Sequence, residues 1–336
     1  MIRVQRYKAR MVSSSCVSII LAITVFATTP ADARDQPIAV NADLSSLNAL
    51  DVFKECDVCP EMVVMPLGSF MMGARPEESR NPFDIYGPDA TLRRREPNEL
   101  NIIPDEYPRH RVEIDIPFAI GRDEITYAEW MLCVEENACS YIPDHRVPTF
   151  DHGYVELKPV HPVINISFND VKEYVDWLNQ EVGQEVYRLP TEAEWEFAAR
   201  AGAETRFPQG QELSAVQANF SRKATEQVQG VEFPDLVDRS VPVAGYELNA
   251  SNAWGVRHII GNVLELTLSC WTFRHLGLLT SSEHYRITEY FFDCRRVSKG
   301  GSFRFAMDGL RPSRRYRPKQ DNRYDDSGFR LVRVLN

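Results

Sequence analysis

Polar and apolar residues alternate with helical spacing in one clear stretch of the chain, between Ser167 and Gly183. Ser167 stands three residues before Asp170, so its hydroxyl and the carboxylate can satisfy the free backbone donors of a first helical turn. Behind it, apolar residues recur along one helix face, at Val171, Tyr174, Val175 and Leu178. Gly183 supplies a stop, because glycine readily adopts the left-handed conformation that ends many helices. The pattern predicts one amphipathic helix here.

The same capping signature predicts two further helices. Thr126 precedes Glu129 by three residues, and Thr191 precedes Glu194 by three residues. The helix after Thr191 is expected to end near Gly202, and its apolar side carries Trp195, Ala198 and Ala199. Upstream, two short apolar runs within residues 61–73 are separated by a Pro-x-Gly turn. That layout predicts two strands joined by the turn.

The rest of the chain is rich in turns and short apolar runs. Residues 78–105 are polar and proline-rich, with three arginines at 93–95, and we expect a long surface loop there. No Gly-, Ser- or Pro-rich linker and no repeat divides the chain. We therefore expect an α+β domain at residues 61–336, held together by loops and disulfides, after a lead-in at 34–60 that is loosely held through residue 55.

The first 33 residues have the layout of a secretory signal peptide. Four basic residues within positions 3–10 precede an apolar run at 17–27, and Ala31-Asp32-Ala33 forms a small-x-small cleavage signal. The run is too short to span a membrane, and no other long apolar run follows. We expect cleavage after Ala33 and a soluble exported protein, periplasmic or secreted. Lipid attachment at Cys16 is the alternative, but no small residue follows it at a lipoprotein-type site.

Charge narrows the range of partners. The formal charge is -10, and loss of the leader, with its four positive charges and one negative charge, makes it -13. An acidic chain argues against nucleic acid as the main partner. Residues 295–336 are the exception, because they hold twelve Lys and Arg against four Asp. One end of the protein can therefore present positive potential.

Six cysteines remain after cleavage, and an oxidising compartment permits disulfides. Fifteen pairings of six cysteines are possible, and the sequence does not select one. Proximity along the chain favours Cys133 with Cys139 and Cys56 with Cys59, which leaves Cys270 with Cys294. A Cys-x-x-Cys at 56–59 is alternatively a redox pair or half of a zinc site. No second Cys-x-x-Cys and no nearby His supports zinc.

Several motifs in a fixed order resemble the formylglycine-generating enzyme, or sulfatase-modifying factor, family. The most specific are Arg188-Leu189-Pro190-Thr191-Glu192-Ala193-Glu194-Trp195-Glu196 and the closing segment that opens with Lys299-Gly300-Gly301-Ser302-Phe303. Shorter matches lie at residues 62–73, 108–112, 124–126, 161–163 and 261–266. The resemblance implies one compact domain of C-type-lectin-like fold, poor in regular secondary structure, and we expect a monomer.

The resemblance also implies two structural calcium sites. The first would use the side chains of Asn219 and Asp235 with the carbonyls of Phe220 and Val237, a set of hard oxygen ligands. The second would use the carbonyls of Gly261 and Val263 with the carboxylate of Glu265. His258 stands where the family has an asparagine, and imidazole is a poor calcium ligand.

The copper-binding cysteine pair of the family has no counterpart here. Motif matching places Phe305 and Leu310 at those positions, and no thiol follows Cys294. Copper is not expected, because soft thiolate ligands select Cu(I). A related iron branch of the superfamily uses closely spaced histidines, whereas the seven histidines here are dispersed. A non-haem iron site would require histidines to converge from distant loops.

Arginines crowd the closing segment, and two interpretations stay open. In the structural one, Arg314, Arg317 and Arg330 pair with Asp321, Asp325, Asp326 or upstream carboxylates. In the functional one, Arg304, Arg311 and Arg315 line a groove that binds a peptide or small anionic ligand, because guanidinium groups read carboxylates by paired hydrogen bonds. Trp254 and Trp271 are core residues or stacking walls, and Trp271 is the preferred ligand-contacting candidate.

Three functions follow from these residues. The leading hypothesis is an exported binding domain that lacks the copper cysteines. The second is an exported oxidase of a peptide-derived small molecule, such as a siderophore precursor, with an acid or base among Glu265, Asp308 and Asp321. The third is sulfatase activation through an unconventional site.

Overall fold

The computed structural model describes residues 39–40, 44–75, 78, 103–148, 153–214, 216–221, 223–225, 239–244, 250–291 and 293–335. The chain divides into two compact units, residues 1–32 and 33–336. The expected signal peptide, Cys16, and nearly all of the expected loop at 78–105 lie outside the described residues. Within the described ranges, no helix has both the length and the apolar character needed to cross a membrane.

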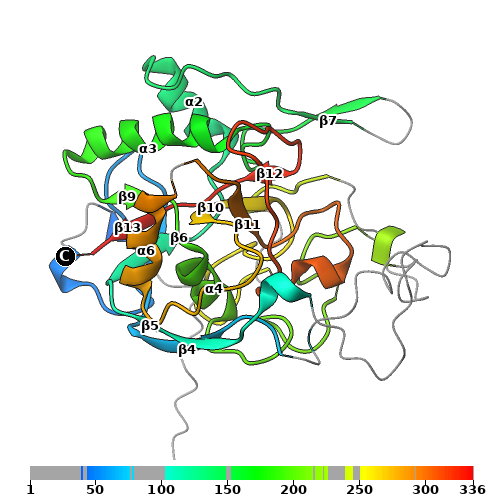
Figure 1. Ribbon diagram of the computed structural model, residues 1–336. Helices are drawn as coiled ribbons and strands as arrows, with labels where there is room; N and C mark the ends of the chain where they lie inside the picture. The colour runs from blue at the N-terminus through cyan, green and yellow to red at the C-terminus, as the bar shows by residue number, and fades with distance from the viewer. Residues whose placement is uncertain are drawn as a thin grey trace, which may run out of the picture. The chain divides into compact units, whose positions relative to one another are not determined.

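The largest sheet of the second unit joins strands from both ends of the chain (Figure 1). Its order is β1 (Ala39–Val40), β2 (Val52–Lys54), β3 (Met62–Val64), β6 (Phe118–Gly121), β13 (Val332–Val334) and β9 (Tyr187–Arg188). The β1–β2 pair is parallel and the others are antiparallel. Residues 52–54, which the sequence assigned to a loosely held segment, therefore form a strand of this sheet.

Three smaller sheets complete the strand structure of the described residues. One has the order β11 (Arg296–Lys299), β10 (Leu264–Cys270) and β12 (Ser327–Gly328). The other two are the antiparallel pairs β4 (Gly68–Met72) with β5 (His110–Ile114), and β7 (Arg146–Pro148) with β8 (Tyr154–Glu156). The two strands predicted within residues 61–73 are confirmed as β3 and β4, although they belong to different sheets.

Four helices begin with a complete capping box. They are α2 (Tyr127–Glu135), α3 (Phe168–Val182), α4 (Glu192–Arg200) and α6 (Ser281–Tyr290). The three boxes predicted from the sequence are confirmed, and Gly183 ends α3 with φ 69°. The fourth box joins Thr280 and Glu283 and was missed. Short 3-10 turns cover Leu44–Ser46, Pro104–Glu106 and Met307–Leu310. With few helices and many loops, the α+β prediction is confirmed.

Two apolar clusters make up most of the core. One packs Trp130, Tyr174 and Phe329 together, with ring centroids 5.6–6.2 Å apart. The other surrounds Trp195 and Phe207. Helix α4 contacts β4, β10, β11 and α6 and lies in the middle of the ribbon in Figure 1. Every residue of α4 is buried, including three glutamates and one arginine, so these charges need partners inside the protein.

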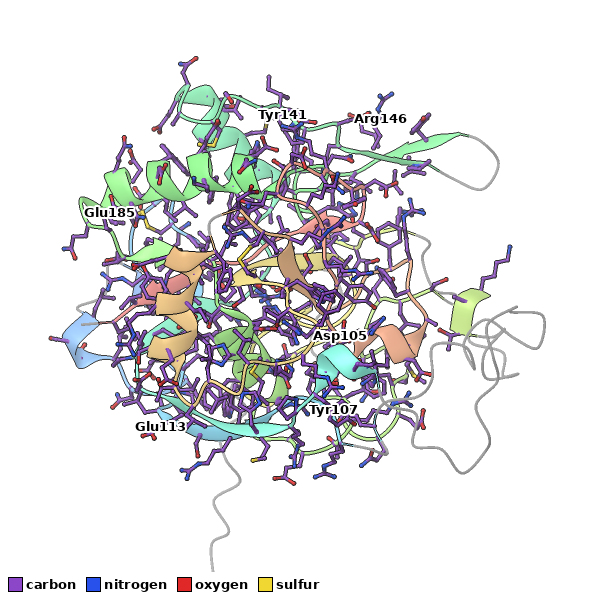
Figure 2. All side chains as sticks on the ribbon, in the orientation of Figure 1. Asp105, Tyr107, Glu113, Tyr141, Arg146 and Glu185 are labelled. Carbon is purple, nitrogen blue, oxygen red and sulfur yellow. A yellow bond between two sulfur atoms is a disulfide. The ribbon has the colours of Figure 1, made fainter. Side chains whose placement is uncertain are left out.

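The three favoured disulfide pairings are confirmed (Figure 2). Cys56 pairs with Cys59, Cys133 with Cys139, and Cys270 with Cys294. The last bond joins the end of β10 to the segment that leads into β11, so it closes the loop that carries α6.

Candidate functional site

Apolar side chains fill the positions at which the resemblance places the catalytic thiols. Phe305 packs on Tyr316 with ring centroids 4.6 Å apart, and Leu310 is completely buried. The turn before them brings backbone very close, since a Cβ added to Gly301 (φ 68°) would lie 2.9 Å from the Gly309 carbonyl. All six cysteines of the described residues are bonded in disulfides. No cysteine thiol of the described residues is therefore free to bind copper at these positions.

Two of the three arginines expected to contact a ligand are internal. Arg311 donates to both carboxylate oxygens of Glu106 at 2.7 and 2.8 Å, and both residues are buried. Arg315 donates to both oxygens of Glu192 at 2.8 and 3.1 Å, and also to the carbonyls of Asp105 and Thr272. Their hydrogen-bonding capacity is used within the fold. The geometry assigns them to internal pairing, not to the groove in which we expected them.

The other arginines of the closing segment are divided between surface and core. Arg304 lies at the surface and pairs with Asp325 at 2.5 Å, so it is the one of the three expected ligand contacts that solvent reaches. Arg330 is buried and donates to both oxygens of Glu265 at 2.6 Å, so its partner is an upstream carboxylate and not one of the three aspartates that shortly precede it. Arg314 lies 3.6 Å from Glu106.

The carboxylates of α4 hold the closing segment to the helix. Glu196 accepts from Lys299 at 3.0 Å, from Arg200 at 3.0 Å and from the Gly73 backbone at 2.8 Å. Burial opposes ionisation of Glu196, but the neighbouring cations outweigh it, and its pKa is lowered to about 2. Glu194 pairs with Arg188 at 2.6 Å. These charges stabilise the scaffold and do not face solvent.

The three acid–base candidates lie in different surroundings. Glu265 is buried and accepts from Trp195 at 2.6 Å in addition to Arg330. Asp308 is buried in an ion pair with Arg206. Asp321 alone of the three is exposed, and it lines an open hollow of about 700 Å³ together with Arg295 and Lys319. A soluble substrate can reach Asp321 and not the other two.

The first expected calcium site fits the described residues in part. The Asn219 side chain is buried, and its Oδ1 atom has no hydrogen-bond partner. A buried oxygen without a partner is suited to bind a cation. Phe220 is also buried, while Asp235 and Val237 lie outside the described residues. Oδ1 is the ligand atom that the prediction requires from Asn219.

The second expected calcium site fits poorly. Gly261 and Val263 are buried as required, but the negative charge of Glu265 is already neutralised by the Arg330 guanidinium. His258 is also buried, and burial together with Arg330 and Arg257 lowers its pKa to about 3. In the ranges that the structure describes, no three His, Cys, Asp or Glu side chains are arranged to hold a metal ion.

Three dispersed histidines nevertheless converge. The ring centroid of His110, on β5, lies 5.5 Å from that of His275 and 6.5 Å from that of His284, on α6. Burial lowers the pKa of His275 to about 4, despite the nearby Glu192 carboxylate. Both ring nitrogens of His275 lack a hydrogen-bond partner. The sequence contained no signal for this cluster, because its members come from a strand, a loop and a helix that are not adjacent in the sequence.

A solvent-facing group of aromatic and arginine side chains follows β10. Trp271 and Phe273 pack edge to face with centroids 4.7 Å apart, and Phe273 is 78% exposed. The Arg317 guanidinium lies 4.6 Å from the centre of the Trp271 ring. The backbone carbonyl of Arg295 accepts from the Trp271 backbone N–H at 2.8 Å, and the Arg295 guanidinium donates to the Arg317 carbonyl at 3.3 Å. Arg274 is the residue after Phe273. We call these five residues the aromatic–arginine surface.

Hydrogen bonds hold this surface in place. Arg315 binds the Thr272 carbonyl, and the Trp271 indole lies 3.4 Å from the carboxylate of Asp105, which is labelled in Figure 2. Arg274, Arg295 and Arg317 are exposed, and within the described residues none of the three forms an ion pair with a carboxylate. Trp271 was expected from the sequence, while the other four members were not.

A domain with this strand order, these capped helices and this Gly-Gly-Ser turn defines a sulfatase-modifying-factor fold. A family description, "Sulfatase-modifying factor enzyme 1-like domain", matches residues 49–335, and the chain belongs to this family. The hercynine oxygenase of Mycolicibacterium smegmatis is 31% identical over 282 residues, which is 74% of this chain and 58% of that protein. The formylglycine-generating enzyme of Thermomonospora curvata is 35% identical over 167 residues, 47% of this chain and 50% of that protein. The chain thus spans about half the length of these relatives.

Solved structures agree on the fold. PvdO from Pseudomonas aeruginosa superposes with a TM-score of 0.60 at 28% identity, covering 86% of this chain and all of that one. Treponema denticola variable protein 1 has a TM-score of 0.53 at 18% identity, covering 82% and 96%, and supports the fold alone. The resemblance noted from the sequence motifs is confirmed.

Proposed function

We propose that this chain is an exported member of its family that binds an acidic peptide segment through the aromatic–arginine surface. One observation carries the proposal: three exposed arginines, Arg274, Arg295 and Arg317, occur beside half-buried Trp271 and exposed Phe273, and none has a carboxylate partner among the described residues. Guanidinium groups bind carboxylates through charge-assisted hydrogen bonds. Phe273 adds apolar area, and burying a phenylalanine side chain contributes about 1.5–3 kcal/mol.

The shape next to this surface supports a peptide rather than a compact ion. Arg295 also lines the open hollow of about 700 Å³, in which Lys319 lies together with Asp293 and Asp321, so the surface continues into a broad recess of mixed charge and not into a closed cavity. An extended segment with spaced carboxylates and one apolar side chain would contact both the arginines and Phe273. The net negative charge of the whole chain disfavours a polyanion such as nucleic acid, which would meet repulsion away from this surface.

Peptide binding tests the proposal directly. A fluorescent peptide of alternating glutamate and glycine around one leucine is titrated with the protein lacking residues 1–33, and fluorescence polarisation is measured. Arg295→Ala combined with Arg317→Ala should weaken binding at least tenfold, because each lost charge-assisted hydrogen bond is worth about 1.5–3 kcal/mol. Arg146→Ala, an exposed arginine paired with Asp144, is the matched control and should bind like wild type. Equal affinity of the double variant and wild type, at equal melting temperature, would refute the proposal.

A second candidate function is oxidation of a peptide-derived small molecule. The relatives named hercynine oxygenase and formylglycine-generating enzyme favour it. Asp321 is the exposed acid–base candidate, beside Arg295 and Lys319. An oxygen electrode, with linear hydroxamate and catechol peptides as substrates, would detect this activity. Consumption of oxygen that Asp321→Asn abolishes would place the oxidase function ahead of peptide binding.

The proposal also includes export through a cleaved leader and binding of calcium at the first site. The layout of residues 1–33 supports a cleaved leader, and amino-terminal sequencing of the protein recovered from the periplasm or medium tests it. The orphaned Oδ1 atom of Asn219 supports calcium at the first site. A hard cation there would join the buried asparagine to residues beyond the described ranges and stabilise that part of the fold.

A further inference from the structure

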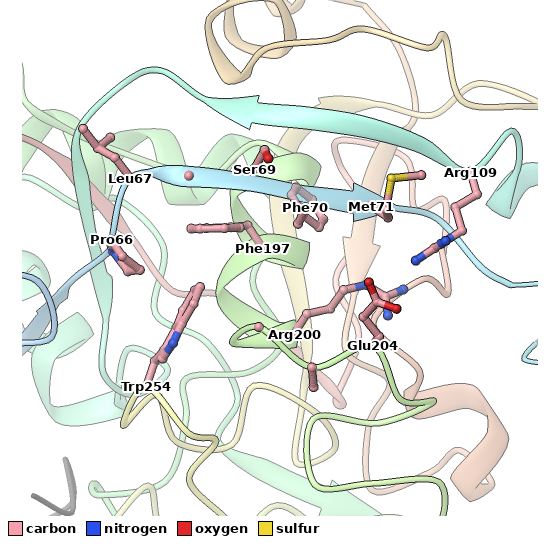
Figure 3. Close-up of a pocket in the computed structure, with 13 residues that line it drawn as sticks. Pro66, Leu67, Ser69, Phe70, Met71, Arg109, Phe197, Arg200, Glu204 and Trp254 are labelled. Atoms are coloured by element: carbon pink, nitrogen blue, oxygen red, sulfur yellow. The ribbon is translucent and has the colours of Figure 1, made fainter. Parts of the chain in front are cut away.

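A pocket of about 350 Å³ opens between β4 and the end of α4, and it shares no residue with the aromatic–arginine surface (Figure 3). Its volume falls within the range that holds small organic ligands. Strand β4 supplies one wall through Phe70 and Met71, and the helix supplies Phe197 and Arg200. Trp254 and Arg109 come from separate loops. The family resemblance assigns no role to this pocket.

One end of the pocket is aromatic. The Phe70 and Phe197 ring centroids are 5.4 Å apart, and Phe197 meets the Trp254 ring edge to face at 4.8 Å. Figure 3 shows these three rings with Pro66 and Leu67 around the same end. Leu67 is 63% exposed, so this apolar lining is open to solvent. An aromatic or flat apolar group would find edge and face contacts with three rings here.

The opposite end carries a guanidinium that no carboxylate of the described residues pairs with. Arg200 is neutralised by Glu196 and Glu78, and Glu204 pairs with Arg75 at 2.5 Å. Arg109 lines the same end, and no carboxylate of the described residues pairs with it. Figure 3 shows the Arg109 side chain on the same side of the pocket as Arg200 and Glu204. An unpaired guanidinium at the rim favours a carboxylate or phosphate on the ligand.

We propose that this pocket binds a small aromatic carboxylate, with its ring against Phe197 and Trp254 and its carboxylate on Arg109. The two ends match the two parts of such a molecule, because the rings take the apolar body and Arg109, which has no carboxylate partner in the described part of the chain, takes the anion. The Glu204 and Arg75 pair at the rim disfavours a second negative group close to the first. The proposal adds a small-molecule site to the peptide surface and does not depend on it.

Calorimetric titration with three probes tests the site: indole-3-acetate, phenylacetate and the neutral amide indole-3-acetamide. At least one carboxylate should bind, and the amide should bind about tenfold more weakly than indole-3-acetate, because it lacks the charge-assisted bond. Arg109→Gln should reduce carboxylate affinity about tenfold and leave amide binding unchanged. Arg146→Gln, at an exposed arginine that pairs with Asp144 and does not line the pocket, is the control.

A second variant tests the pocket without removing charge. Ala203 lines the cavity, so Ala203→Leu should occupy its space and abolish carboxylate binding while the melting temperature stays near that of wild type. Arg295→Ala with Arg317→Ala should leave carboxylate binding intact, which separates this site from the peptide surface. The proposal is overturned by absence of binding for both carboxylates, by equal affinity for acid and amide, or by unchanged affinity in the Arg109 variant.

Discussion

Acidification should destabilise this protein through His275, which is buried in neutral form. Its pKa is lowered to about 4, mainly by burial, while Glu192 and Glu196 partly oppose Arg315 and Lys299 around it. An unfolded histidine titrates near 6.5. Between about pH 6.5 and pH 4 the unfolded chain therefore binds a proton that the folded chain does not. Stability must fall as the pH falls through this window.

The size of the effect follows from the shift. At pH 5 the unfolded imidazole is almost fully protonated, and the folded one is almost fully neutral. The linkage relation then gives a loss of about 2 kcal/mol between pH 7 and pH 5 from His275 alone. Other groups also titrate, and Glu124 works in the opposite direction, because burial raises its pKa well above the usual range. A comparison with a variant that lacks this imidazole isolates its share.

The assay is urea unfolding of wild type and His275→Gln at pH 7 and pH 5. Wild type should lose about 2 kcal/mol more than the variant over this interval, whatever the other groups contribute. Equal pH dependence of wild type and His275→Gln would show that the imidazole is protonated or solvated in the folded protein, and would refute the reasoning.

Three further predictions test the scaffold. Lys299→Met leaves the buried Glu196 carboxylate without one of its cations. Chemical denaturation should show that the free energy of unfolding falls by about 3–5 kcal/mol. A loss below about 1 kcal/mol would contradict the pairing. Thr280→Ala removes the cap of α6 and should cost about 1 kcal/mol, while Glu289→Ala, at an exposed position of the same helix, serves as control. Chelation of calcium should lower the melting temperature of wild type but not of Asn219→Ala; a wild-type melting temperature indifferent to the chelator counts against the first calcium site.

Local signals in the sequence predicted local structure well. The capping boxes at Thr126, Ser167 and Thr191 placed three helices, and the box at Thr280 would have placed the fourth. That helix was overlooked because its apolar residues do not form a clear stripe. Disulfide pairing followed from proximity along the chain, which limits the partners that short loops can bring together.

Local sequence signals did not predict which side chains pair when the partners are distant in the sequence. Arg311 binds Glu106 across 205 residues, and Arg315 binds Glu192 across 123. Charge alone shows that an arginine needs a partner, but only the packing of α4 and the closing segment shows which carboxylate reaches it. For that reason the sequence placed these arginines at a ligand. The exposed arginines beside Trp271 carried no stronger local signal than the buried ones.

Mass spectrometry of a cysteine peptide gives the most direct test of the central claim, that apolar side chains have replaced the catalytic thiols. The purified protein is incubated with a sulfatase-motif peptide, copper and oxygen, beside a protein-free control. With Phe305 and Leu310 at the thiol positions, the peptide should keep its cysteine mass in both samples. Conversion of the cysteine above the control would contradict the account and make this chain an oxidase of the formylglycine-generating type.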